Sequence, residues 1–93
     1  MKKTENATIV REVNLAFASA RKAEIAVLRM GRDHSTTDDE YREAQRDAAE
    51  KRAFYNGMDY LASTLGVNVE FDALSESLDH DYWDLFFSRS ENK

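Results

Sequence analysis

The 93-residue chain contains no proline and only three glycines. Proline breaks helices most strongly and glycine is the next most unfavourable residue, so long stretches of this chain can stay helical. Cysteine is also absent, which excludes disulfides, thiolate metal sites and a cysteine nucleophile. A chain of this length supports one modest core. The sequence therefore predicts a single all-α domain, residues 1–93, held together by side-chain packing alone.

The first predicted helix covers residues 4–30. At 100° per residue, most of its apolar side chains fall on one stripe about 120° wide, which is typical of a helix packed on a core. The stripe contains Ile9, Val13, Ala16, Phe17, Ala20, Ala23, Val27 and Met30. Leu15 lies on the opposite side and Ile25 on the flank. We expect Gly31 to end this helix as a left-handed C-cap.

The second predicted helix covers residues 38–65. Thr37 and Glu40 have the spacing of a capping box at its start, and Gly66 is its stop signal. The Asn56-Gly57 pair is typical of hairpin turns, but no alternating apolar residues flank it, so we expect the helix to continue through Gly57.

This second helix carries two apolar strips. One strip spans its length, and we expect the first helix to cover it, because a short loop favours an antiparallel pair. The other strip is confined to the second half and predicts a second neighbour, which we expect to be the C-terminal segment. It consists of Phe54, Met58, Leu61 and Leu65.

The C-terminal segment, residues 67–88, begins with alternating apolar residues but has no strand to pair with, so we expect an extended linker packed on the helices. Asp72 is a candidate cap for a helical turn from Ala73 to Leu78, and Asp79 for a final helix. The predicted fold is thus a long antiparallel helical hairpin with one or two short C-terminal helices packed across it.

Charge is distributed as a gradient along the chain. Residues 1–34 carry seven basic and four acidic groups, residues 35–66 carry four and seven, and residues 67–93 carry two and seven. The net charge of -5 argues against nucleic acid as a direct ligand. The charge gradient also places an acidic surface on the segment that is richest in aromatic residues. Such a split pattern would favour self-association as well.

The acidic and aromatic residues of the C-terminal segment are the candidate partner-binding site. They either close the core or anchor a basic partner, because Trp and Tyr are common at binding hot spots and negative charge steers the encounter. A short helix with aromatic residues on two faces cannot bury both, so we expect Trp83 or Phe87 to be exposed or to lie in a subunit interface. The candidate residues are Glu70, Glu76, Asp79, Asp81, Tyr82, Trp83, Asp84 and Phe87.

Other candidate sites carry less chemistry. Glu24 lies within the apolar stripe, where a carboxylate needs partners, and Arg21, Tyr41 and Gln45 are candidates. His34 and His80 each lie among acids but lack zinc-site spacing, so cap and loop roles explain them better. Nucleophile and phosphate-binding motifs are absent. We expect neither an enzyme nor a cofactor or metal protein.

No apolar run follows the basic start of the chain and none is long enough to cross a membrane, so we expect a cytoplasmic protein. The leading hypothesis is a small acidic interaction protein that binds a basic, nucleic-acid-binding site on another protein. In size, charge and lack of a site it resembles the small inhibitors encoded by phages and plasmids, including anti-restriction and anti-CRISPR proteins. No family motif carries that resemblance, so no site residue follows from it.

Two other hypotheses remain open. One is a structural hairpin that forms homo-oligomers, with Leu15, Ile25 and the C-terminal aromatic residues in the subunit contact. The other is a small-ligand or metal binder that uses Glu24 or the acids around His80.

Overall fold

Three helices make up the fold: α1 (Lys3–Met30), α2 (Asp38–Thr64) and α3 (Ala73–Glu91). The computed structural model describes residues 3–91, and the side chains of residues 5–88. Within these residues every regular element is a helix. The all-α prediction is confirmed, and the bounds of the first two helices agree with the predicted ones to within one residue.

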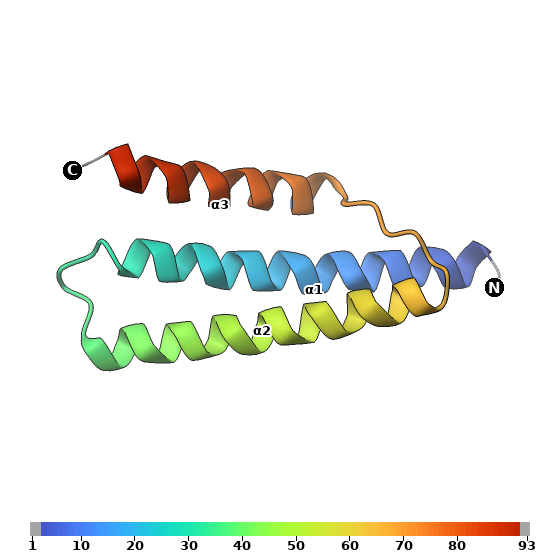
Figure 1. Ribbon diagram of the computed structural model, residues 1–93, viewed down its shortest axis with the longest axis horizontal. Helices are drawn as coiled ribbons and strands as arrows, with labels where there is room; N and C mark the ends of the chain where they lie inside the picture. Colours follow the sequence, from blue (N-terminus) through green and yellow to red (C-terminus); the bar gives the residue numbers. More distant parts are fainter. Residues whose placement is uncertain (1–2, 92–93) are drawn as a thin grey trace.

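The hairpin of α1 and α2 forms the larger contact of the fold. Contacts between the two helices run in opposite chain directions: Val13 packs with Ala62, and Glu24 bonds to Arg52. Figure 1 shows α2 returning beside α1 after the loop. The buried apolar residues are few and mostly small, since five of these nine are alanines: Val13, Ala16, Phe17, Ala18, Ala20, Ile25, Ala48, Ala62 and Val67.

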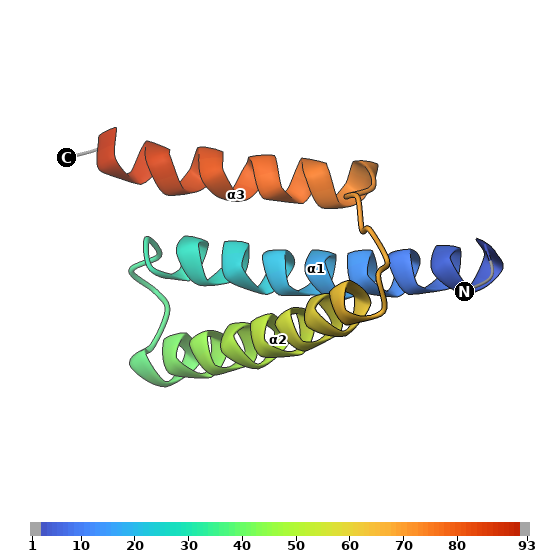
Figure 2. The ribbon, with the colours of Figure 1, turned by 45° about the vertical axis from the view of Figure 1, so that its right-hand side comes forward.

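Helix α3 lies along the other side of α1 and runs in the same direction (Figures 1 and 2). Its contacts advance along both helices together: Arg21 bonds to Asp79, and further on Arg32 bonds to the Leu85 carbonyl oxygen. Among the described residues α3 packs against α1 and not against α2. The centre of the fold is therefore α1, with one helix on each side.

The position of α3 contradicts one expectation. The C-terminal segment was expected to cover the second apolar strip of α2, yet that strip is uncovered, with Phe54 64%, Leu61 60% and Leu65 56% exposed. The linker explains why, because it crosses α1, where Phe71 stacks on Phe17 with ring centroids 4.2 Å apart. Helix α3 then starts on the far side of α1. We call Leu15, Phe54, Met58, Leu61 and Leu65 the hairpin strip.

The linker itself behaves as predicted. Val67 is buried beside Val13 and Ala62, and Val69 packs against the same cluster. Asp72 caps α3, since its side chain accepts a hydrogen bond from the Ser75 backbone N–H at 2.8 Å. The predicted second cap at Asp79 is wrong, because α3 continues through that residue and the Asp79 carboxylate bonds to Arg21 instead.

The predicted start of α2 is confirmed. Thr37 Oγ1 accepts from the Glu40 backbone N–H at 3.1 Å, and Glu40 Oε1 accepts from the Thr37 backbone N–H at 2.9 Å. The left-handed cap predicted at Gly31 is wrong, because the chain leaves α1 through turns bonded from Arg32 to Arg29 and from Asp33 to Met30. Such turns require no positive φ.

The left-handed glycine is Gly66 instead, at φ 75°. The Val67 N–H bonds to the Ala62 carbonyl at 2.8 Å, and the Gly66 N–H bonds to that of Ser63 at 3.0 Å. This pair of bonds is a Schellman motif, and it brings Val67 back over the last turn of α2.

Alanine substitutions at two glycines are expected to have opposite effects. An added Cβ meets nothing within 4 Å at Gly57 or Gly66. Gly66→Ala should cost about 1 kcal/mol, because alanine disfavours positive φ. Gly57→Ala should stabilise by about 0.5–1 kcal/mol, because alanine is the better helix former. Thermal unfolding of both variants tests this, and equal shifts would contradict the assigned backbone geometry.

Candidate functional site

The aromatic residues of α3 form a continuous cluster. Trp83 contacts Tyr82 edge to face at 5.0 Å between ring centroids, and it stacks on Phe87 at 5.8 Å. Phe86 contacts Trp83 at 5.5 Å and Phe87 at 5.6 Å. Tyr82 is half-buried towards α1, whereas Trp83 is 41% and Phe87 58% exposed. The cluster thus has one end in the fold and the other in solvent, as expected for Trp83 and Phe87.

Four of the exposed residues of α3 share one helical face. Glu76, His80, Trp83 and Phe87 follow one another at steps of four, three and four residues, which places them in line. Asp84 lies beside them, with its carboxylate 3.1 Å from His80 Nε2. We call these five residues the acidic aromatic strip. It contains four of the eight predicted site residues: Glu76, Trp83, Asp84 and Phe87.

The other four predicted site residues lie elsewhere. Asp79 and Tyr82 face α1, where both contact Arg21. Asp81 is exposed on the neighbouring face of α3, and Glu70 lies in the linker, where its backbone carbonyl accepts a hydrogen bond from Asn14. The acidic residues that the sequence placed in one group therefore have different roles in the fold.

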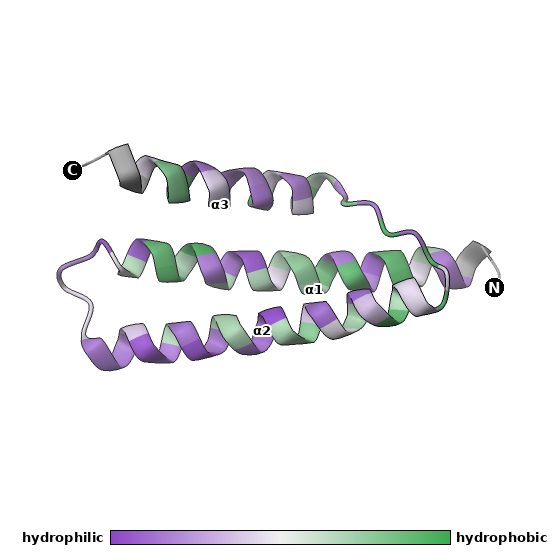
Figure 3. Cartoon of the chain, in the orientation of Figure 1, coloured by the Kyte–Doolittle hydropathy of each residue, from purple (hydrophilic) through white to green (hydrophobic). Residues whose placement is uncertain are grey.

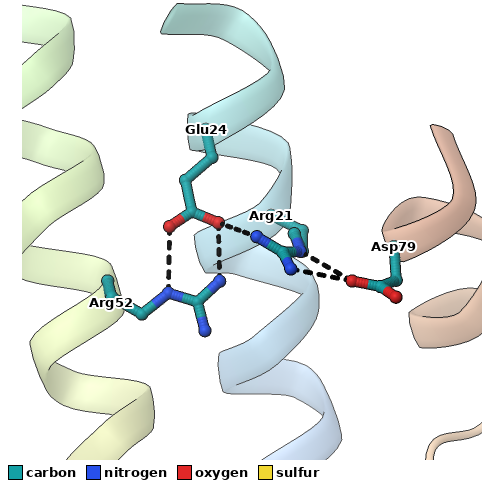
Figure 4. A network of polar contacts seen from close by, with 4 residues as sticks. All are labelled: Arg21, Glu24, Arg52 and Asp79. Atoms are coloured by element: carbon teal, nitrogen blue, oxygen red, sulfur yellow. Dashed lines mark hydrogen bonds and ion pairs between the residues drawn. The ribbon is translucent and has the colours of Figure 1, made fainter. Parts of the chain in front are cut away.

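A chain of ion pairs links all three helices (Figure 4). The Arg52 guanidinium donates to both oxygens of Glu24, at 2.9 and 2.6 Å. Arg21 Nη1 donates to Glu24 at 2.9 Å, and Arg21 Nε and Nη2 donate to Asp79 at 3.0 and 2.8 Å. We call these four residues the interhelix network. Because it contains two cations and two anions, the network as a whole is neutral.

The predicted role of Glu24 as a structural carboxylate agrees with this geometry, and one of its predicted partners, Arg21, is confirmed. Tyr41 and Gln45 do not bond to it; the second partner is Arg52, which the sequence analysis did not consider. A signal for Arg52 was present, because it shares a helical face with Ala48 and Tyr55, and a cation on that apolar strip needs an acid opposite.

The network shifts the pKa of Glu24 and of Arg52. Burial raises the pKa of Glu24, but the hydrogen bonds and positive charges of Arg52 and Arg21 outweigh it, so the pKa lies below the ordinary value of 4.5. The pKa of Arg52 is raised, mainly by its hydrogen bond to Glu24. Burial raises the pKa of Tyr55 beside them. The Glu24–Arg52 pair is therefore ionised near neutral pH.

Arg21 also makes an aromatic contact. Its guanidinium carbon lies 4.2 Å from the ring centroid of Tyr82 and 5.6 Å from that of Trp83. The same guanidinium bonds to Asp79. The fold thus binds one of its own arginines between a carboxylate and an aromatic ring of α3.

A second residue that the sequence analysis missed is Asn14, which is buried and joins α1 to the linker. Its Nδ2 donates to the carbonyl oxygens of Val10 and Glu70, each at 3.0 Å, and its Oδ1 accepts from the Asp72 backbone N–H at 2.9 Å. The Ser75 hydroxyl donates to the Asn14 carbonyl oxygen at 3.4 Å. Asn14 therefore fixes where α3 begins.

Two of the shallow hollows on the surface of the described residues lie near the candidate sites. One, of about 260 Å³, lies over α1 with α2 and α3 on either side, and its lining includes Glu24, Gln45 and Tyr82. The other, of about 320 Å³, lies on the hairpin strip, between Leu15, Phe54 and Met58. Figure 3 shows apolar and polar residues alternating along the second half of α2, where most of the hairpin strip lies.

The described residues contain no group of three or more histidine and acidic side chains placed to hold a metal ion. None of the helices within residues 3–91 has the length and apolar character needed to cross a membrane. Comparisons with protein-family models, curated protein sequences and solved structures found no match for this chain.

Proposed function

We propose that this protein acts by binding rather than catalysis, and that the acidic aromatic strip of α3 docks on a basic site of another protein. The observation that carries this proposal is the exposure of Trp83 and Phe87, stacked on each other and bordered by carboxylates. Exposed aromatic residues of this kind are typical of binding hot spots, and the flanking negative charge favours a basic partner.

The contact of Arg21 within the fold supports the proposal that α3 binds arginine side chains. Arg21 is held between the ring of Tyr82 and the carboxylate of Asp79. Trp83, the next residue along α3, presents its indole to solvent, and the exposed carboxylate of Asp84 lies beside it in contact with His80. A planar guanidinium from a partner can stack on the indole and bond to a carboxylate, a combination that favours arginine over lysine.

The class of partner follows from the spacing of the acids. Glu76 and Asp84 are two turns apart on an exposed helix, and carboxylates attract the same Lys and Arg side chains that bind phosphates. We infer that the partner is a nucleic-acid-binding protein and that the strip competes with nucleic acid for its groove. An inhibitor of the phage or plasmid anti-defence type, acting in the cytoplasm, fits this proposal.

Capture of partners from a host lysate tests the proposal. Wild-type protein should retain a basic protein that nucleic acid displaces. Replacing both Trp83 and Phe87 with alanine should weaken this interaction at least about tenfold, the usual loss at a hot spot. Glu76→Gln with Asp84→Asn should weaken it less and make it less salt-dependent. Tyr60→Ala, at an exposed aromatic residue of α2, is the matched control. Retention by the double alanine variant would contradict the proposed surface.

A further inference from the structure

The hairpin strip is a second exposed apolar surface, separate from the acidic aromatic strip. Phe54, Met58, Leu61 and Leu65 follow one another on one face of α2 at steps of four, three and four residues, over about 16 Å of helix. Leu15 lies next to them across the hollow of about 320 Å³. Helix α3 does not cover this face. Met58 is half-buried against the core cluster that contains Val67, and the other four residues of the strip are exposed.

The amount of apolar surface on the strip is large for a chain with so small a core. The four exposed residues of the strip present roughly 100 Å² each, or about 400 Å² together, which is in the range of functional patches: Leu15, Phe54, Leu61 and Leu65. The buried core is mostly alanine, while these larger side chains remain in solvent. A standard interface needs about 800 Å² from each partner, so the strip supplies about half of that area and its polar margin would supply the rest.

The shape of the fold also indicates that the face carrying the hairpin strip is an interaction surface. Its extents are 50 × 26 × 16 Å, and its helices lie side by side with α1 in the centre (Figure 2). Stable helical domains bury the apolar face of each layer against another layer. Here the face that carries the hairpin strip has no second layer within the chain.

Charge on the same face of α2 selects the orientation in which two copies can pair. Four of the six acidic residues of its first half continue the line of the strip towards the N-terminus of the helix: Glu40, Glu43, Asp47 and Glu50. Arg46 pairs with Glu43 and Lys51 with Asp47, which leaves a net negative charge on this line. In a parallel pairing of two copies these acids would face each other. In an antiparallel pairing about a two-fold axis the apolar halves meet, and the two acidic halves point away from each other.

We propose that a second copy of this chain covers the hairpin strip, forming a two-fold dimer with antiparallel α2 helices. Area, the open layer and the charge pattern of α2 all fit this occupant. The contact differs from the one expected from the sequence, because Ile25 is buried within the single chain and α3 takes no part. The acidic aromatic strip remains free in the dimer, so each dimer presents two copies of it.

Sedimentation equilibrium of the full chain over a wide concentration range tests this proposal. The wild type should sediment as a dimer. Leu61→Glu places a charge at the centre of the strip and should shift the protein to monomer, while circular dichroism stays helical because Leu61 is exposed in the single chain. Tyr60→Glu is the matched control: Tyr60 is 72% exposed, but it lies 100° around the helix, so the dimer should persist.

The remaining outcomes are decisive too. A monomeric wild type would overturn the proposal, as would a dimer that withstands Leu61→Glu or that Tyr60→Glu disrupts equally. Trp83→Ala should leave the dimer intact. A dimer that fails to form, together with unchanged partner capture, would reject this inference and keep the proposed function. A dimer that forms as predicted, together with no capture of a basic partner, would reject the proposed function alone.

Discussion

Glu24→Gln is expected to lower the free energy of unfolding by about 2–3 kcal/mol, among the largest effects of any single change in this chain. The Glu24 side chain is only 19% exposed and accepts hydrogen bonds from two arginines. Glutamine has nearly the same shape but no charge, so two partly buried guanidinium groups would lose their shared anion. Urea denaturation followed by circular dichroism measures the loss.

The matched control is Glu43→Gln. Glu43 also pairs with an arginine, Arg46, but both side chains are exposed and the pair is 3.5 Å apart. An exposed pair of this kind contributes at most about 0.5 kcal/mol. Equal losses for the two variants would show that the interhelix network contributes no more than a surface ion pair.

Glu24→Gln should also change the dependence of stability on pH. The pKa of Glu24 is lower in the folded chain than its ordinary value of 4.5, so the unfolded state binds its proton first as pH falls. Its contribution is therefore full above about pH 4.5 and is lost as pH falls through the folded pKa. Glu24→Gln should be less sensitive to acid in that range. The variant should keep some sensitivity of its stability to acid. Hydrogen bonds from Ser35 lower the pKa of Asp33, and hydrogen bonds from Thr37 lower the pKa of Glu40.

Asn14→Ala is expected to cost about 2–4 kcal/mol, because it removes the side chain that bonds to the linker at two points. The Asp72 N–H and the Glu70 carbonyl would lose their partner in a partly buried place. The effect should be concentrated at the start of α3. In the Asn14→Ala variant, amide hydrogen exchange should accelerate more in α3 than in the hairpin, because α3 packs on α1 alone.

Lys22→Ala is the control for this experiment, since Lys22 also lies on α1 but is exposed and belongs to neither the interhelix network nor the hairpin strip. It should leave the exchange of α3 amides unchanged. Uniform loss of protection over all three helices in the Asn14 variant would contradict a local role for Asn14 and indicate a single cooperative unit.

The local features of the fold were accessible from the sequence because short-range patterns determine them. The capping box at Thr37, the Asp72 cap and the extended linker each depend on residues within a few positions of one another. Continuity of α2 through Gly57 also follows from the pattern around it. Patterns alone did not decide which glycine takes the left-handed conformation, because the turns after Met30 and after Leu65 are alternative ways to end a helix.

The long-range features were not accessible in the same way. The side of α1 on which α3 lies depends on Asn14 and Phe17, whose partners are more than 50 residues away. Helical periodicity identifies the apolar strips of α2 but not which of them the chain itself will cover. The same limit applies to the site, where the composition of α3 indicated an acidic aromatic surface but could not separate Asp79, which binds Arg21, from the exposed Asp84.

Trp83 allows the most direct measurement of the central claim, because it is the single tryptophan of the chain and lies in the acidic aromatic strip. Its fluorescence can be recorded while the captured basic partner, with its own tryptophans replaced, is added. We predict a shift of the emission to shorter wavelength that saturates with partner and reverses when nucleic acid is added. Saturable binding with no change in Trp83 emission would contradict the proposal that this strip is the binding surface.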